Sequence, residues 1–427
     1  MASEWTIQPL EDCMAALIDY RGKTPQKTSS GIPLITAKVV KGGRIETPDE
    51  FIAIADYEPW MRRGIPEAGD VVITTEAPLG EVAQLGSERL ALAQRLIALR
   101  GKPGVLDNKF LKFLLQSADV QDQLRARASG TTVLGIKQSE LRKVLLRFPA
   151  IDQQRAIAHI LGTLDDKIEL NRRMNETLEA MAWALFKSWF VDFDPVKAKA
   201  KGRDPGLPKH LVGHFPDSFE DSELGKIPKG WTVRGLDEIA RFLNGLALQK
   251  YPPADGRSLP VIKIAQLRAG NTNGADQASA DLDPDYIVQD GDILFSWSGS
   301  LECVHWAGGR GALNQHLFKV SSENYPRWLC YLGVHQHLED FRHIAAGKAT
   351  TMGHIQRHHL SDAKLAIPSP EVRLAMDKSF QPLLESTWQR AVQSRTLTAL
   401  RDTLLPKLIS GELRVKDAER FLNDRGL

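Results

Sequence analysis

The sequence lacks several features that would point to a particular class of protein. Its 427 residues include three cysteines, Cys13, Cys303 and Cys330. These are too few and too scattered for a disulfide framework, so we expect a reducing compartment. No apolar run approaches the ~18 residues of a membrane span, and Met1–Trp5 lacks the basic and apolar segments of a signal peptide; we therefore expect a cytoplasmic protein. The net charge of +2 excludes a histone-like, strongly basic protein.

The motifs of common catalytic sites are missing as well. No G-x-G-x-x-G, H-E-x-x-H or G-x-S-x-G is present, nor the Asp/Asn-Pro-Pro-Tyr/Phe tetrapeptide of amino-methyltransferases. Gly22-Lys23-Thr24 is similar to the end of a phosphate-binding loop, but Leu17 stands where that loop needs a glycine. Asp165-Asp166-Lys167 has the letters of a nuclease site but falls on the polar face of a predicted helix. We therefore expect no catalytic residue and no bound cofactor.

Histidine is concentrated in the second half of the chain. Eight of the 11 histidines lie between residues 305 and 359, near Cys303 and Cys330. Their spacings match no paired-ligand pattern, and the first half has no counterpart of this group. We expect no metal site, and histidines that lie on the surface or contact DNA.

The two halves of the chain match each other. Short stretches of the first half recur in the second, in the same order and at a nearly constant offset. Because a series of ordered matches is not expected by chance, we predict a tandem duplication. The matched stretches are Trp5–Leu10 with Trp231–Leu236, Ile32–Ile35 with Leu259–Ile262, Gly69–Val72 with Gly291–Leu294, Leu92–Gln94 with Leu313–Gln315, and Ile136, Leu141 and Pro149 with Ile355, Leu360 and Pro368.

Each repeat is predicted to have two parts. Short β-branched runs such as Val71–Thr75 and Val261–Ile264 indicate strands, and Lys109–Leu115 indicates a helix. A long helical pattern then follows a proline, and Gly411 stands just after the second pattern. The sequence thus predicts an α+β fold with two tandem mixed α/β domains and two long helices. The predicted boundaries are a first domain over 1–150, a helix over 151–191, a linker over 192–229, a second domain over 230–368, a helix over 369–413 and a tail over 414–427.

Both long helices carry a coiled-coil seam, in which residues recur in alternating steps of three and four. Each seam is apolar at its ends and polar in its middle, so we expect an antiparallel pair with Asn175 near Ser394. Pro382 and Pro406 count against an uninterrupted second helix, and two long helices in separate cores remain the alternative. The seam positions are Leu161, Leu164, Ile168, Asn171, Asn175, Leu178, Ala182, Leu185 and Trp189, with Phe380, Leu383, Thr387, Arg390, Ser394, Leu397, Arg401, Leu404 and Leu408.

Polar residues follow the matched strands, and they differ between the repeats. Such side chains read base edges and hold phosphates in DNA complexes. Ordinary surface loops have the same composition, but here matching framework residues flank loops of different content. We therefore predict two surfaces that bind different DNA sequences. The candidate DNA contacts are Thr36, Lys38, Lys41, Arg44, Arg62, Arg63, Thr75, Glu76 and Gln94 in the first repeat, and Lys263, Gln266, Arg268, Ser296, Trp297, Ser298 and Gln315 in the second.

The first long helix ends in more large side chains than one seam can use. We expect these side chains to pack against the mixed domains, with docking of a partner subunit as the second interpretation. The linker that follows is rich in proline, glycine and lysine, which predicts a solvated segment. The candidate docking residues are Met181, Trp183, Phe186, Trp189 and Phe190.

Taken together, these stretches give the chain a definite resemblance. It resembles the specificity subunit of type I restriction-modification systems over nearly its whole length. The most specific segments are Leu161–Met174, Leu185–Phe193 and Leu404–Leu413, to which Trp231–Ile239 and Gly291–Leu294 add. One loop departs from the family, because Glu76–Gly80 stands where many members have a Ser/Thr-Gly-rich turn.

The resemblance implies two target-recognition domains held apart by two long antiparallel helices, each domain reading one part of a split site in double-stranded DNA. It also implies partners: two methyltransferase subunits, which methylate adenine at N6 with S-adenosylmethionine, and motor-nuclease subunits, which use ATP and magnesium. None of that chemistry would belong to this chain. Two alternatives remain open at this point, a stand-alone sequence-specific repressor and a self-contained modification enzyme.

Overall fold

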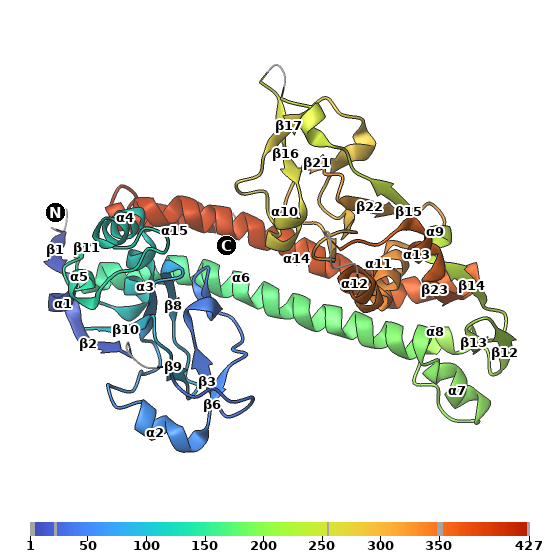
Figure 1. The fold of residues 1–427 in the computed structure, drawn as a ribbon, viewed down its shortest axis with the longest axis horizontal. Helices are drawn as coiled ribbons and strands as arrows, with labels where there is room; N and C mark the ends of the chain where they lie inside the picture. Colours follow the sequence, from blue (N-terminus) through green and yellow to red (C-terminus); the bar gives the residue numbers. More distant parts are fainter. Residues whose placement is uncertain (1–4, 21–23, 254–255, 348–352, 425–427) are drawn as a thin grey trace. The chain divides into compact units, whose positions relative to one another are not determined.

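The computed structural model describes residues 5–20, 24–253, 256–347 and 353–424. The chain folds into two compact units, in which helices and strands are mixed (Figure 1). Unit 1 comprises Met1–Lys167 and Leu397–Leu427, and unit 2 comprises Ile168–Thr396. In the described part of the chain, no helix combines the length and the apolar character needed to cross a membrane.

Unit 1 is built on a four-stranded antiparallel sheet in the order β2-β10-β7-β8. Every residue of β7 is buried, as its continuous apolar run predicts. The predicted helix over Lys109–Leu115 is confirmed within α3. The elements are β1 (Thr6–Pro9), α1 (Leu10–Cys13), β2 (Met14–Asp19), β3 (Ile32–Ile35), η1 (Ala37–Val39), β4 (Val40–Lys41), β5 (Arg44–Ile45), β6 (Phe51–Ile52), η2 (Ile54–Asp56), α2 (Tyr57–Trp60), β7 (Val71–Thr75), β8 (Leu79–Gln84), β9 (Ala91–Leu92), β10 (Leu96–Gly101), α3 (Asn108–Gln116), α4 (Ala118–Arg127), α5 (Gln138–Leu141), β11 (Leu145–Phe148) and α15 (Val415–Asn423).

Unit 2 repeats this plan with the antiparallel order β15-β22-β19-β20. Its elements are α7 (Asp194–Ala200), α8 (Lys209–Val212), β12 (Phe219–Ser222), β13 (Gly225–Pro228), β14 (Thr232–Gly235), α9 (Leu236–Ile239), β15 (Arg241–Asn244), η4 (Leu248–Lys250), β16 (Ser258–Ile262), α10 (Ile264–Ala269), β17 (Gln277–Ser279), η5 (Pro284–Tyr286), β18 (Ile287–Val288), β19 (Ile293–Ser296), β20 (Cys303–His305), β21 (Gly311–Leu313), β22 (Leu317–Ser321), α11 (Arg327–Gln336), α12 (Leu338–Ala346), α13 (Arg357–Asp362) and β23 (Lys364–Ile367).

The strand pairing confirms the predicted tandem repeat. In unit 1, β3 pairs in parallel with β9, so that Leu34 lies opposite Ala91; in unit 2, β16 pairs in parallel with β21, so that Val261 lies opposite Ala312. The first and last strands of each domain also pair, β1 with β11 and β14 with β23. The sequence matches therefore correspond to equivalent positions in two copies of one fold.

The two long helices are α6 (Ile151–Phe186), which continues into the π-helical turn η3 (Lys187–Val191), and α14 (Pro370–Ser410). Gly411 follows α14 with a φ of 79°, the left-handed conformation in which glycine ends helices. The expectation that Pro382 and Pro406 interrupt this helix is wrong. Both prolines lie on its exposed face, where water can satisfy the carbonyl groups that their missing N–H groups leave free.

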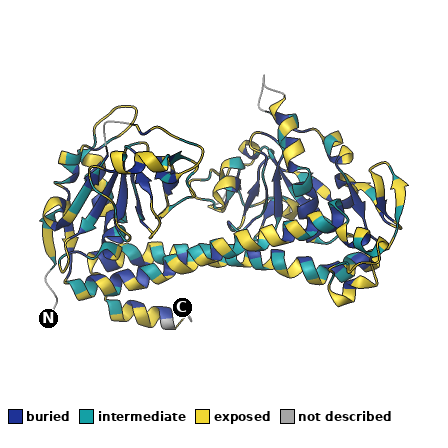
Figure 2. Ribbon diagram, turned by 90° about the horizontal axis from the view of Figure 1, so that it is seen from below, coloured by how far each residue is buried: buried dark blue, intermediate teal, exposed yellow. Residues whose placement is uncertain are grey.

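The seam between these helices is confirmed, with one correction in register. Figure 2 shows buried and exposed residues alternating along both helices. Asn171 is 2% exposed and donates to Oε1 of Gln393 (2.9 Å) and Oγ of Ser394 (3.2 Å). Asn175 donates to the carbonyl of Thr387 (2.9 Å), so it lies about one to two helical turns from the predicted partner, Ser394. The helices are antiparallel, and the polar middle of one seam faces the polar middle of the other, as expected.

The segment predicted as a solvated linker is instead folded onto unit 2. It forms α7, α8 and the hairpin of β12 and β13. Val196 and Leu211 are fully buried, and Phe215 packs edge-on against Trp189. Its few apolar residues therefore decide its structure, although lysine, proline and glycine dominate its composition.

Candidate DNA-recognition interface

In unit 1, three segments that are distant in sequence meet beyond the end of β7. The amide of Thr75 donates to the carbonyl of Arg95 (2.8 Å), and the amide of Ile136 donates to the carbonyl of Thr75 (2.9 Å). The segments enclose a hollow of about 390 Å³. It brings together three of the predicted DNA contacts, Thr75, Glu76 and Gln94, with three residues that the sequence analysis missed, Arg95, Ser129 and Lys137.

The equivalent place in unit 2 is built by the same main-chain bonds. The amide of Trp297 donates to the carbonyl of His316 (3.3 Å), and the amide of Ile355 donates to the carbonyl of Trp297 (3.0 Å). The indole of Trp297 donates to Oδ1 of Asn244 (3.0 Å) and to the carbonyl of Gln315 (3.1 Å). The structure thus brings Gln315 together with the candidates at the end of β19, which are Ser296, Trp297 and Ser298. Their counterparts in unit 1 lie together in the same way.

Burial removes some of these candidates from direct contact with DNA. Ser296 is fully buried, and its hydroxyl donates to the carbonyl of Ser300 (2.7 Å) and accepts from the amide of Glu302 (2.8 Å). Thr75 and Ser298 are 2% and 3% exposed. All three were predicted DNA contacts, but their side chains leave almost no surface that a base or phosphate could touch.

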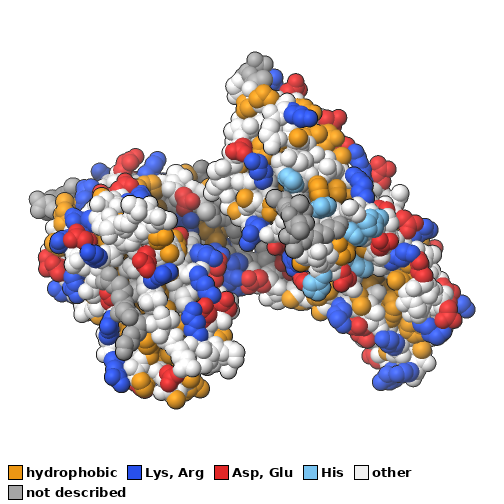
Figure 3. Space-filling view, viewed as in Figure 1, with side chains coloured by type: hydrophobic (Ala, Val, Ile, Leu, Met, Phe, Trp, Pro, Cys, Tyr) orange, Lys and Arg blue, Asp and Glu red, His pale blue; other side chains and the backbone are white. Residues whose placement is uncertain are grey.

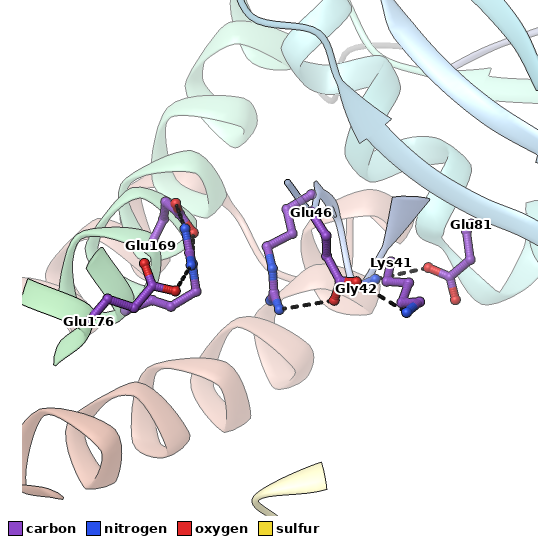
Figure 4. A network of polar contacts seen from close by, with 8 residues as sticks. Lys41, Gly42, Glu46, Glu81, Glu169 and Glu176 are labelled. Atoms are coloured by element: carbon purple, nitrogen blue, oxygen red, sulfur yellow. Dashed lines mark hydrogen bonds and ion pairs between the residues drawn. The ribbon is translucent and has the colours of Figure 1, made fainter. Parts of the chain in front are cut away.

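The basic residues near β4 and β5 are paired with carboxylates. Lys38 lies 2.9 Å from Asp49 and 3.0 Å from Glu50, and its hydrogen bond to Asp49 raises the pKa of the lysine. Lys41 lies 3.1 Å from Glu46, a pair visible in Figure 4, and Arg44 reaches the same carboxylate at 3.7 Å. These side chains are exposed to solvent, but their charge is offset by the carboxylates. The hydroxyl of Thr36 is buried without a hydrogen-bond partner among the described residues.

The predicted arginine pair lies away from the hollow, in the loop after α2. Both side chains are exposed. A guanidinium nitrogen of Arg63 donates to the carbonyl of Asp19 (3.1 Å), which ties the loop to β2. Arg62 forms no ion pair with any described residue, so its charge is the freer of the two.

The remaining candidates of unit 2 lie around α10. Lys263 forms an ion pair with Asp276, and Oε1 of Gln266 accepts from the amide of Lys263 (3.3 Å) at the start of the helix. Arg268 is exposed. Gln266 therefore stabilises the helix start, whereas Arg268 has its side chain in solvent.

Most of the predicted docking residues are core residues of unit 2. Phe186 is fully buried, and Trp189 and Phe190 are 3% and 4% exposed. Phe190 lies against Trp231 and Trp328, so the packing interpretation is correct and these three residues offer no docking surface. Met181 is 50% exposed and Trp183 is half-buried, which leaves these two accessible.

The nuclease-like segment Asp165-Asp166-Lys167 on α6 contributes Asp165 to an ion-pair network. Asp165 lies 2.5 Å from Lys112 and 2.9 Å from Arg401, and its side chain is 16% exposed. It therefore joins α3, α6 and α14 within unit 1, where a plain polar helix face was expected. On the next turns, Glu169 and Glu176 share the guanidinium of Arg172 (Figure 4), and the hydrogen bond from Arg172 lowers the pKa of Glu169 to about 2.

Several histidine side chains lie near one another on the face of unit 2 that Figure 3 shows. Burial lowers the pKa of His305 to about 3, and His335 and His337 contact the carbonyls of Cys303 and Lys364. Across the described ranges, no group of His, Cys, Asp and Glu has the arrangement of a metal site. Desolvation therefore accounts for the lowered pKa of His305, and main-chain carbonyls bind His335 and His337.

The repeat and its geometry agree with comparisons against known proteins. The family described as the type I restriction modification DNA specificity domain matches residues 4–180 and 228–378. The chain belongs to this family. The two matched ranges each cover one of the mixed α/β domains and at least part of the long helix that follows it.

Two similar proteins are named as specificity subunits, and one solved structure has a similar fold. The chain is 28% identical to the type I restriction enzyme MjaIX specificity subunit of Methanocaldococcus jannaschii, over 82% of this chain and 78% of that protein. It is 24% identical to the HindI specificity subunit of Haemophilus influenzae, over 76% and 82%. Its fold is similar to the crystal structure of the type I restriction-modification S subunit from M. genitalium, with a TM-score of 0.56, 16% identity, and coverage of 95% of this chain and 96% of that one.

Proposed function

We propose that this chain is the DNA specificity subunit of a type I restriction-modification complex and recognises a two-part DNA site, one part with each α/β domain. Its role is to direct adenine-N6 methylation, and cleavage of unmodified DNA, by partner subunits. The family and the relatives support this assignment over a repressor or a self-contained enzyme.

The observation that carries the proposal is a shared scaffold with different side chains at the same place. Thr75 and Trp297 occupy equivalent positions. The amide of each donates to the carbonyl of the residue just before the neighbouring strand, Arg95 or His316, and the carbonyl of each accepts from the amide of an isoleucine, Ile136 or Ile355. The neighbouring side chains differ in charge and shape between the units. A duplicated scaffold of this kind is suited to reading two different sequences.

The catalytic steps are assigned to partners. We propose that methyltransferase subunits supply S-adenosylmethionine chemistry and that motor-nuclease subunits use ATP and magnesium, while this chain binds none of these cofactors. The polar clusters described above support this division: Asp165 is held by Lys112 and Arg401, and Glu169 by Arg172 and Arg173. These carboxylates are neutralised by their own neighbours. We further propose that Met181 and Trp183, which stay accessible, contribute to a partner interface.

The test is co-expression of the chain with its methyltransferase subunits, followed by sequencing of methylated adenine. We expect methylation within a motif of two short parts separated by unspecified bases, and its loss when this chain is omitted. Methylation that persists without the chain would contradict the proposal. Transfer of labelled methyl groups to DNA by the purified chain alone would contradict the division of labour.

A further inference from the structure

The two units match residue by residue at the end of the four-stranded sheet. In unit 1, β7 and β10 place Thr74 opposite Leu96; in unit 2, β19 and β22 place Ser296 opposite Leu317. The hydroxyls of Thr74 and Ser296 both accept from the amide of a glutamate further along the chain, Glu81 (2.9 Å) or Glu302 (2.8 Å). This shared bond shows which residues after Thr74 in unit 1 correspond to which residues after Ser296 in unit 2.

Counting outward from these anchors, Glu76 corresponds to Ser298, and Arg95 corresponds to His316. Glu76 bridges to Gly135, and Ser298 bridges to His354, again at matched positions. The side chains within each unit contact each other: Nε of Arg95 lies 2.7 Å from Oε1 of Glu76, and Oγ of Ser298 lies 3.0 Å from Nδ1 of His316. Both units therefore have a pair of contacting side chains at the same position of the fold, but the residue types of the pair differ between the units.

We propose that these two matched pairs, Glu76 with Arg95 and Ser298 with His316, determine which base pair each domain reads. This inference rests on the proposed function. The main-chain hydrogen bonds around each pair are the same, although Arg95 has a positive φ and His316 does not. The side chains can therefore differ while these bonds are kept. That is the property a specificity-determining position requires.

The chemistry of each pair suits base recognition. A guanidinium binds O6 and N7 of guanine with two hydrogen bonds, and a carboxylate can accept from N4 of cytosine. Arg95 and Glu76 are 49% and 43% exposed along their side chains, so both remain accessible. In unit 2, Ser298 is 3% exposed, so its side chain orients His316 and does not itself meet a base. The imidazole of His316, which is half-buried and lies 5.9 Å from the ring of Trp297, presents a different donor and acceptor pattern.

The backbone of Arg95 supports a functional constraint. Its φ of 74° lies in the left-handed region, which a residue with a long side chain rarely adopts. Such strain persists where the surrounding structure enforces it and is concentrated at functional sites. Glycine would adopt this φ without strain, so the arginine side chain stands here at a conformational cost.

The experiment uses the complete complex of this chain with its methyltransferase subunits and compares R95G, R95K and the double variant E76S/R95H. R95G removes the side chain while relieving the backbone, so its thermal midpoint should not fall. Binding of R95G to the cognate duplex should weaken by about 5- to 150-fold, with discrimination lost at one base pair. E76S/R95H should change the preferred base at one position of one half-site, and H316A should act on the other half-site.

The matched control is E58S/R89H, which makes the same chemical change at another exposed pair of unit 1, where Arg89 lies 3.0 Å from Glu58. It should leave the methylated motif unchanged. Wild-type affinity and motif in R95G and E76S/R95H would overturn the inference. So would a loss that is equal for all sequences and accompanied by a shallower salt dependence, because Arg95 would then hold a phosphate. If the wild-type complex itself reads no two-part site, the proposed function fails instead.

Discussion

At the scale of single residues, pairing with carboxylates decides how much positive charge a basic side chain offers to the phosphates of DNA. Lys38, Lys41 and Arg44 each have a carboxylate within 4 Å, whereas Arg62 has no ion pair among the described residues. DNA binding releases counterions only in proportion to the protein charge that newly meets phosphate. A lysine already neutralised by Asp49 and Glu50 should therefore contribute less than Arg62.

We predict that Arg62→Ala weakens DNA binding about equally for all sequences and lowers the slope of log affinity against log salt by about 1. Fluorescence anisotropy over a salt series measures this slope. Lys38→Ala is the control and should change the slope less. Arg63→Ala should also cost roughly 1 kcal/mol of stability, because it removes the bond to the carbonyl of Asp19. A slope that is the same for Arg62→Ala and the wild type would contradict a phosphate contact.

Glu169 provides a prediction about pH at the same scale. Its folded pKa of about 2 lies below its ordinary value of 4.5, mainly through the hydrogen bond from Arg172. Its contribution to stability is therefore complete above about pH 5 and is lost as the pH falls from 4.5 toward 2. We predict that Glu169→Gln lowers the free energy of unfolding at pH 7 by at most ~1 kcal/mol, because the group is partly exposed.

Denaturant unfolding of wild type and Glu169→Gln at pH 7 and at the lowest pH that keeps the chain folded tests this sign. The difference between the two proteins should shrink toward acid. Asp166→Asn is a suitable control, because Asp166 is exposed on the same helix. A difference that grows toward acid would show that the charge of Glu169 is not stabilising.

At the scale of elements, the long helices were predictable because their signals are local. Steps of three and four residues define the seam, and Gly411 ends the second helix by its own conformation. The register between the helices was not predictable, since it depends on anchors elsewhere in the fold. Asp165 joins Lys112 to Arg401, and Arg395 binds Asp290 at 2.7 Å. The pairing of Asn175 with Ser394 was predicted from the seam positions alone, which carry no information about these contacts.

The site shows the same limit. Thr75, Arg95 and Ile136 meet through main-chain bonds between segments far apart in the sequence, which composition does not reveal. A signal for Arg95 was present, because it follows the matched triplet that ends in Gln94, at a position where the other repeat has His316. The folded linker gave only a weak signal, in Val196 and Leu211.

The buried Asn171 supports a prediction about the helix pair. Its amide group satisfies Gln393 and Ser394 in the seam, and such a group fixes register at some expense of stability. We predict that the double variant Asn171→Leu/Ser394→Ala has a thermal midpoint equal to or above that of the wild type, but a less specific register. Ser394→Ala alone should lower the midpoint slightly, because Gln393 still pairs with Asn171.

Crosslinking between cysteines placed at exposed positions of α6 and α14 would report the register of each variant. Crosslinks at a single offset in the double variant would show that other contacts, such as those of Asp165, fix the register. A midpoint well below that of the wild type would mean that the polar group stabilises the pair outright.

At the scale of the whole molecule, the duplicated fold predicts that each α/β domain works independently. Exchanging residues 1–150 for the matching part of a relative should change one half of the methylated motif. The side chain of Gln154 binds the carbonyls of Val105 and Pro149 and the amide of Asp107. The exchanged segment must keep these three hydrogen bonds across the junction. The reciprocal exchange of 230–368 should change the other half. If either exchange alters both halves, the domains do not read DNA separately.

The continuity of α6 and α14 through both units leads to the last prediction, that helix length sets the gap between half-sites. The sequence alone placed the insertion near Asn175 and Ser394. The structure moves it to the boundary between the units, after Lys167 in α6 and after Thr396 in α14, so that the pair of Arg395 with Asp290 stays intact.

One heptad at each point keeps the seam and lengthens both helices by ~10 Å, which corresponds to up to ~3 base pairs of DNA. The added rotation is only ~20°, so each domain should still meet its groove. Bending of the DNA could absorb part of the change at a few kcal/mol, so growth by one or two base pairs would also fit. Sequencing of methylated DNA from the lengthened variant gives the new gap. A heptad in α6 alone is the control and should disrupt the pair, whereas an unchanged gap with full activity in the double insertion would show that the helices do not set the distance.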